Sequence, residues 1–181
     1  MMNRLLYRLT ANMPARLIKL DGRPYLERYY VGRLFGVTFY LHRFVSSDSE
    51  RHLHNHPWGW GRALVLCGGY DEEFVTDLAP WRGPSGCVTD MRRVRFWNRV
   101  NGNHFHRIAN AAPGTWTLFF HGRRVELPND AGPGYVAKGW GFLERVEAGK
   151  GWATGFFPFA SASGHWWLDA PKGRDVGREA L

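Results

Sequence analysis

The hydrophobic pattern of the chain is that of many short strands. Apolar, aromatic and β-branched residues gather in short runs, and Gly, Pro, Asn and Asp stand between them. The clearest runs are 35–45, 63–67, 91–100, 104–110 and 115–121. Runs of this kind, separated by turn residues, are typical of antiparallel strands. Helical periodicity is sparse, so we predict an all-β protein built as an antiparallel sandwich or barrel.

Several turns are marked by their residues. Asp21-Gly22-Arg23-Pro24 reads as a turn, and Gly68-Gly69 interrupts an apolar run. Asn101-Gly102 lies between two strand-like runs and predicts a β-hairpin. Loops are expected at 77–90 and 128–134.

Length and composition fit one domain. A chain of 181 residues is long enough to bury a core, and a hydrophobic fraction of 44% argues against disorder. We expect an N-terminal extension at 1–20, with a short helix and an entry strand, and a barrel at 21–168. The last residues, 169–181, are polar with Pro and Gly and are expected to form a flexible tail.

The formal net charge of +8 raises the question of nucleic acid. The arginines are scattered, and charge supplies affinity without defining a site. Nucleic-acid binding therefore stays open without being favoured.

No run approaches the roughly 18 apolar residues of a membrane span, and no signal peptide is evident, so we expect a cytoplasmic monomer or homodimer. P-loop, dinucleotide, Cys-x-x-Cys and Ser-His-Asp patterns are absent from the sequence.

Five of the eight histidines form two groups: His52, His54 and His56, then His104 and His106. Residues two apart in a strand point to the same face. Two strands inside a barrel can therefore surround one divalent ion with imidazoles, which suit iron, zinc, nickel and manganese. The isolated histidines, His42, His121 and His165, are expected to be ordinary core or surface residues.

These residues carry a resemblance to a known family. His54-x-His56, followed by an apolar strand that ends at Gly68-Gly69, resembles the first cupin motif, and His106 with Asn110 resembles the second. The strings LHNHPW, LVLCGGY and WTLFFHG resemble small cupin-domain proteins of bacteria and phages. The resemblance extends roughly from Gly22 to Phe142. It implies a jelly-roll barrel, or double-stranded β-helix, with few short helices and with His54, His56 and His106 as metal ligands.

One position departs from the family pattern. Cupins usually add a glutamate ligand shortly after the second histidine, where this chain has Trp60 and Gly61. The next acids are Asp71 and Glu72, beyond the double glycine. The resemblance thus implies a three-histidine site similar to that of thiol dioxygenases. Such a site keeps more positive charge and favours an anionic substrate.

Five residues near the proposed ligands each have two possible roles. His52 and His104 are each either an extra ligand or a partner that orients a ligand. Trp58 and Trp60 follow the ligand strand and either roof the cavity or pack as core rings. Arg62 either clamps a substrate anion or lies at the rim.

Three functions remain open from the sequence. The first is an Fe(II)-dependent oxygenase, such as a non-heme iron dioxygenase, acting on a small anionic substrate. The second is a non-oxidative isomerase, lyase or hydrolase that uses zinc, nickel or manganese. The third is a non-catalytic cupin that binds an anionic ligand or nucleic acid.

Overall fold

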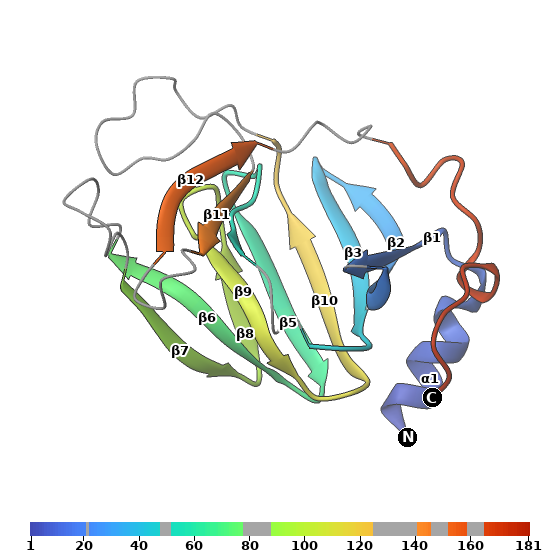
Figure 1. Ribbon diagram of the computed structural model, residues 1–181. Coiled ribbons are helices and arrows are strands. Elements are labelled where there is room, and N and C mark those ends of the chain that lie inside the picture. The colour runs from blue at the N-terminus through green and yellow to red at the C-terminus, as the bar shows by residue number, and fades with distance from the viewer. Residues whose placement is uncertain (21, 48–51, 78–87, 125–140, 146–151, 159–164) are drawn as a thin grey trace.

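The protein consists of two antiparallel β-sheets packed face to face (Figure 1). A computed structural model describes residues 1–20, 22–47, 52–77, 88–124, 141–145, 152–158 and 165–181. The first sheet has the order β1-β2-β3-β10-β5-β8, and the second has the order β12-β11-β4-β9-β6-β7. No helix in these residues is long and apolar enough to cross a membrane.

The strands of the first sheet are β1 (Ala15–Leu20), β2 (Arg23–Leu34), β3 (Val37–Phe44), β10 (Thr115–His121), β5 (Gly61–Cys67) and β8 (Trp97–Val100). Those of the second are β12 (Trp152–Pro158), β11 (Gly141–Arg145), β4 (Leu53–His54), β9 (His106–Ala111), β6 (Tyr70–Asp77) and β7 (Val88–Val94). The described helices are α1 (Met2–Leu9) and the 3-10 turns η1 (Thr10–Asn12) and η2 (Gly173–Asp175). The predicted loops at 77–90 and 128–134 lie mostly or wholly outside the described residues.

The chain winds as a jelly roll. From β3 onward it alternates between the sheets: β3, β5, β8 and β10 belong to the first, and β4, the β6–β7 pair, β9 and β11 to the second. This alternation places β10 between β3 and β5, and β4 between β11 and β9. This is the strand order of a jelly roll, in which the chain alternates between two packed sheets. The predicted fold class, an all-β jelly-roll barrel with few short helices, is confirmed.

The prediction of a β-hairpin at Asn101-Gly102 is wrong. The strands on either side, β8 and β9, belong to different sheets, so this turn is a crossover between them. An Asn-Gly pair indicates a tight turn locally, whereas the partner of each strand is decided by which faces are buried together.

The interior has two levels. At one level, apolar side chains from both sheets pack together, among them Leu26, Phe44, Val65 and Ile108. At the next level, Tyr40 and Phe119 pack with smaller residues, and buried polar side chains join them, including His42 and His121. Buried polar groups need partners, so the second level is the place to look for chemistry.

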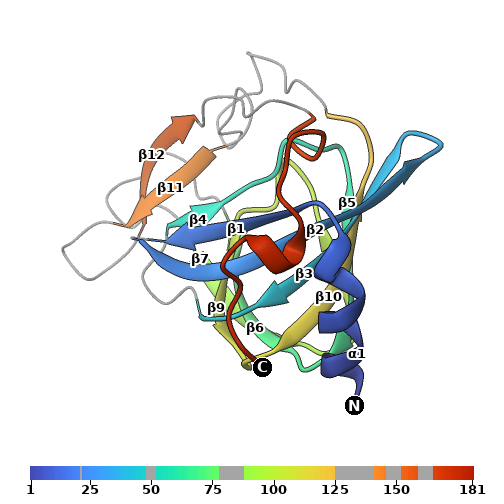
Figure 2. The same cartoon turned by 90° about the vertical axis from the view of Figure 1, so that its right-hand side faces the viewer.

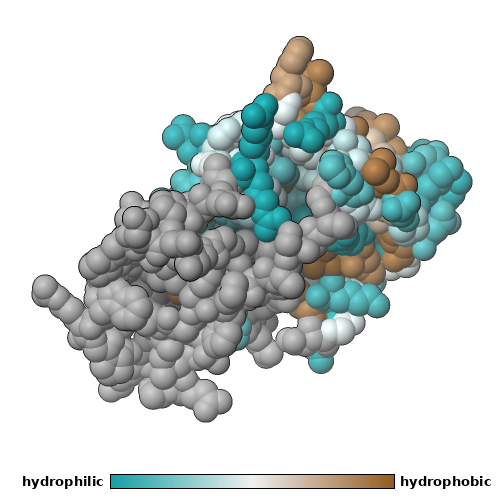
Figure 3. Space-filling model, turned by 90° about the horizontal axis from the view of Figure 1, so that it is seen from above, coloured by the Kyte–Doolittle hydropathy of each residue, from teal (hydrophilic) through white to brown (hydrophobic). Residues whose placement is uncertain are grey.

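Helix α1 covers part of the outer face of the first sheet, and both chain ends lie beside it (Figures 1 and 2). Trp116, fully buried, stacks on Tyr29 at a centroid distance of 5.7 Å. Its indole nitrogen donates a 2.7 Å hydrogen bond to the side chain of Asn3 in α1. Leu6 and Leu41 belong to the same cluster. The described residues on the face seen from above include both hydrophilic and hydrophobic ones (Figure 3).

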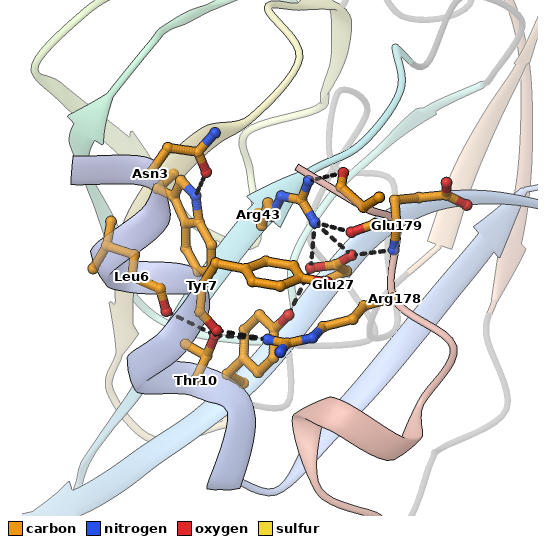
Figure 4. A network of polar contacts seen from close by, with 11 residues as sticks. Asn3, Leu6, Tyr7, Thr10, Glu27, Arg43, Arg178 and Glu179 are labelled. Carbon is orange, nitrogen blue, oxygen red and sulfur yellow. Dashed lines mark hydrogen bonds and ion pairs between the residues drawn. The ribbon is translucent and has the colours of Figure 1, made fainter. Parts of the chain in front are cut away.

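A buried ion pair holds the C-terminal residues against the same face (Figure 4). The carboxylate of Glu27, which is fully buried, accepts hydrogen bonds from Arg43 at 3.0 Å, Tyr29 at 2.6 Å and the backbone nitrogen of Glu179 at 2.8 Å. Arg43 also donates to the carbonyls of Glu179 and Ala180. Residues expected from the sequence to form a tail thus complete the hydrogen bonding of a buried pair.

The first twenty residues also contribute to the barrel. Strand β1 pairs with β2 in antiparallel register, with Ala15 opposite Tyr29. The backbone nitrogen of Ala15 donates to the carbonyl of Pro171, and that of Gly173 donates to the carbonyl of Met13. The two ends of the chain are therefore hydrogen-bonded to each other. The N-terminal segment therefore supplies a short helix and an edge strand, the two elements that its sequence predicts.

Candidate metal centre

Three histidine rings meet inside the barrel. His54 ends β4, His56 follows two residues later, and His106 begins β9. His54 and His106 stand directly opposite each other across the antiparallel β4–β9 pair. The three ring centroids are 5.0 to 5.1 Å apart, and one nitrogen from each ring lies within 4.8 Å of the others. The structure thus brings together the three residues that the sequence motifs single out.

The residue between the first two histidines fixes their backbone. Asn55 points the opposite way, is fully buried, and donates a 2.7 Å hydrogen bond to the carbonyl of Gly102. The Gly102 nitrogen donates in turn to the carbonyl of Trp58 at 3.1 Å. The crossover that leads to His106 is therefore tied to the segment that carries His54 and His56.

Glu72 determines which nitrogen His106 presents. The Nδ1 of His106 lies 2.5 Å from the Glu72 carboxylate, which as an anion can only accept. Nδ1 therefore carries the hydrogen, and Nε2 offers its lone pair toward His56, whose Nε2 is 2.8 Å away. A carboxylate that orients a ligating histidine through its second nitrogen is a recurring arrangement in metal sites.

The Glu72 carboxylate is ionised although it is fully buried. Burial alone would raise its pKa, but hydrogen bonds from His104 and His106 and from Asn98 outweigh burial and hold the pKa well below its usual range. Arg92 also donates to it at 2.5 Å. The negative charge of Glu72 thus lies behind His106, and the group formed by His54, His56 and His106 contains no carboxylate.

Two of the three histidines, His56 and His106, are neutral near pH 7. Burial lowers the pKa of His56 well below 6.5, and the neighbouring His106 and His54 lower it further. Burial also lowers the pKa of His106, against the opposing effect of Glu72. Neutral imidazole is the form that binds metal, so no proton has to leave these two rings near pH 7.

The two optional histidines occupy different places. His104 lies on the Glu72 side of His106, with its Nε2 3.3 Å from the carboxylate, and belongs to a second group made of Glu72, His104 and His106. His104 therefore lies next to His106, on the side away from His54 and His56. His52 is exposed and belongs to neither group of candidate ligands in the described part of the chain.

The two tryptophans that follow the histidines, Trp58 and Trp60, lie on opposite faces of the first sheet. Trp58 stacks on His56 at 5.0 Å and on His121 at 4.0 Å, so it lies against the trio. Trp60 is 37% exposed and contacts Phe120 instead. Arg62 alternates along β5 with inward residues and donates to the carbonyl of Gly61. Trp58 therefore flanks the interior site, while Trp60 and Arg62 face away from it.

A cation that the sequence does not single out lies within the barrel. Arg28 donates a 3.0 Å hydrogen bond from Nε to Nε2 of His42, and its guanidinium lies 5.6 Å from the Tyr40 ring centroid. Burial lowers the pKa of Arg28 to about 10. Among the described residues, no carboxylate forms an ion pair with it. Its charge also lowers the pKa of His56 and His121, after the larger effect of burial.

The comparisons with known proteins find matches among solved structures, at low sequence identity. No protein-family model and no curated protein matches the sequence. Solved structures that match include hydroxypropylphosphonic acid epoxidase from S. wedmorenis, with 14% identity over 60% of this chain and 55% of that chain and a TM-score of 0.39. KdgF from Halomonas sp. shows 16% identity over 60% of this chain and 94% of that one, with a TM-score of 0.41.

A cupin-2 domain from Rhodospirillum rubrum matches with 15% identity, over 66% of this chain and 77% of that chain, at a TM-score of 0.38. The chain spans about half the length of the epoxidase, 55%. At these values the similarity assigns neither activity nor substrate. The winding of the strands and the interior histidines establish a jelly roll with a candidate three-histidine metal centre.

Proposed function

We propose that the protein is a metal-dependent enzyme that binds one divalent ion through His54, His56 and His106. The observation that carries this proposal is the convergence of three imidazoles, with nitrogens within 4.8 Å of one another, from β4, the segment after it and β9. Three protein ligands leave further coordination positions for small molecules, as catalytic metal sites require. Asn55 ties the backbone between His54 and His56 to the crossover, and Glu72 holds the His106 ring, which supports a preorganised arrangement.

Fe(II) is the ion that we assign to the site, and oxygenation is the reaction class. The ligand set is all nitrogen, which suits iron among other ions, and it has no carboxylate to reduce the positive charge. Bound there, Fe(II) would supply a redox centre for an organic substrate and O₂. Trp58 and Phe119 pack beside His56 and exclude water from this side of the trio.

The substrate that we propose is a small organic anion. Arg28 supports this, since its cation lies in the barrel with a neutral imidazole and a phenol ring as neighbours. Its Nε donates to His42, and no hydrogen bond joins its Nη groups to another described residue, so they could bind a carboxylate or phosphate. A guanidinium in a water-poor interior binds such groups strongly because the pair is weakly screened.

The test is anaerobic purification followed by metal analysis and oxygen consumption. We expect iron as the bound metal, and oxygen uptake that depends on an added small thiol, carboxylic acid or phosphonate. Uptake should disappear in His106→Ala and persist in His165→Ala, which changes an exposed histidine. A protein reproducibly filled with zinc, nickel or manganese would overturn the oxygenase assignment in favour of non-oxidative chemistry.

A further inference from the structure

The outer face of the first sheet is only partly covered. Helix α1 packs over Trp116 and Leu41, but the part of the face formed by β3, β10, β5 and β8 farther from the helix has no described element over it. We call this part the aromatic face. Its members are Phe39, Trp60, Arg62, Trp97, Arg99 and Phe120.

The rings of the aromatic face form one connected group. Phe120 lies at its centre, 5.5 Å from Phe39, 5.8 Å from Trp97 and 6.2 Å from Trp60, measured between ring centroids. Trp97 is 46% exposed and Trp60 is 37% exposed, although both are large apolar side chains. Contiguous exposed rings of this kind mark a surface that binds a partner.

The charges of this face all have one sign. Strands β3, β10, β5 and β8 contain no Asp or Glu. Arg62 and Arg99 stand directly opposite each other across β5 and β8, and neither forms an ion pair with a described residue. Like charges directly opposite in a sheet are destabilising, so this pair costs folding energy that an anionic partner would recover.

We propose that the aromatic face binds single-stranded nucleic acid. Bases would stack on Trp60, Trp97 and Phe120, and phosphates would pair with Arg62 and Arg99. Stacking on exposed rings requires bases that are not already stacked in a duplex, which selects single strands. The net charge of +8 adds long-range attraction to a polyanion.

A second copy of the chain is a poorer occupant. In a two-fold symmetric dimer each copy would present the same surface, so the Arg62–Arg99 pairs of the two copies would approach each other without any acid on the face to offset them. The face also lies on the opposite side of the first sheet from the histidine trio. The inference is therefore independent of the proposed enzyme activity.

The test is fluorescence anisotropy of the protein with a labelled oligouridylate of about twelve nucleotides, within the range of about 4 to 16 that single-strand-binding OB folds cover, over a range of salt. Trp97→Ala and Trp60→Ala should each weaken binding roughly tenfold, the loss expected for one stacked base. Arg62→Gln and Arg99→Gln should each reduce the slope of log affinity against log salt by about 0.7. The control variants Arg174→Gln and Leu168→Ala, both at exposed positions in the C-terminal segment, should bind like the wild type.

Circular dichroism would verify that each variant is folded. The proposal is overturned if the four variants of the aromatic face bind like the wild type, or if Arg174→Gln changes the salt slope as much as Arg62→Gln, since binding would then follow net charge alone. It is also overturned if sedimentation shows a dimer that Trp97→Ala dissociates, because the face would then be an interface between two copies.

Discussion

The Nδ1 of His106 lies 2.5 Å from the carboxylate of Glu72. The chain has no glutamate at the ligand position of the first motif, but this carboxylate contacts a candidate ligand through its second nitrogen. A carboxylate bound directly to the ion would cancel one of its charges. Placed behind the imidazole, it instead makes the ring more basic and fixes its orientation. An ion held by His106 would keep its full charge for an anionic ligand, and the ring keeps its tautomer.

Glu72→Gln is expected to weaken metal binding about 10- to 100-fold, the effect usual for removing such a partner. The amide is neutral and can present its NH₂ group to His106, so it no longer selects one tautomer. Competition with a chromophoric chelator would measure the affinity. Glu73→Gln is the matched control, because Glu73 is the next residue in β6 and pairs with Arg107 instead. Equal losses in the two variants would contradict the role of Glu72.

The contact between Glu72 and His106 could not be predicted from the sequence. The motifs were sufficient for the jelly-roll class and for the meeting of His54, His56 and His106, because both depend on strand alternation. Glu72 reaches His106 only because β6 pairs with β9, with Phe74 opposite His106. That pairing is non-local. The one local signal was that Glu72 alternates with Tyr70 and Phe74 in a strand that follows Gly68-Gly69.

The same alternation explains Trp60 and Arg62. In β5 the buried residues are Gly61, Ala63 and Val65, so Arg62 faces outward. Glycine and alanine carry too little hydrophobicity for the sequence to reveal which face is inward. The sequence does not single out Arg28, for the complementary reason. A charged residue in a strand is normally on the solvent side, and only the packing of β2 against β3 places Arg28 beside His42.

We predict that Arg28→Gln abolishes the response to anionic ligands without removing the metal. The metal's spectrum would be followed anaerobically as small thiols and acids are added, and metal content would be measured in the same samples. Arg62→Gln is the control with the same change of charge, and its response should equal that of the wild type. Loss of response in Arg62→Gln with retention in Arg28→Gln would reverse the assignment.

The metal-free protein should lose stability as pH falls. Folding depresses the pKa of His42, His56 and His106 below the 6.5 of an unfolded chain. Below pH 6.5 the unfolded state therefore binds more protons, and the free energy of unfolding decreases by about 1.4 kcal/mol per pH unit for each such histidine. Denaturant titrations at pH 7, 6 and 5 would show this fall. A free energy independent of pH in this range would contradict the buried, neutral state of these rings.

Arg43→Met is expected to destabilise the fold by about 3–5 kcal/mol, because it leaves the Glu27 carboxylate buried without its cation. It also removes the donors to the carbonyls of Glu179 and Ala180. Thermal or denaturant unfolding would measure the loss, and Arg174→Met, at an exposed arginine, should change stability little. A loss no larger in Arg43→Met than in Arg174→Met would show that the C-terminal residues are not held by this pair.

The most direct test of the metal centre is the number of ions bound per chain in the wild type and in single histidine variants, measured by elemental analysis after loading with Fe(II) under anaerobic conditions. The structure predicts one ion per chain in the wild type and in His165→Ala, and little bound metal in His54→Ala, His56→Ala and His106→Ala. Full occupancy in any of those three variants, or a wild type that binds no ion, would contradict the assignment.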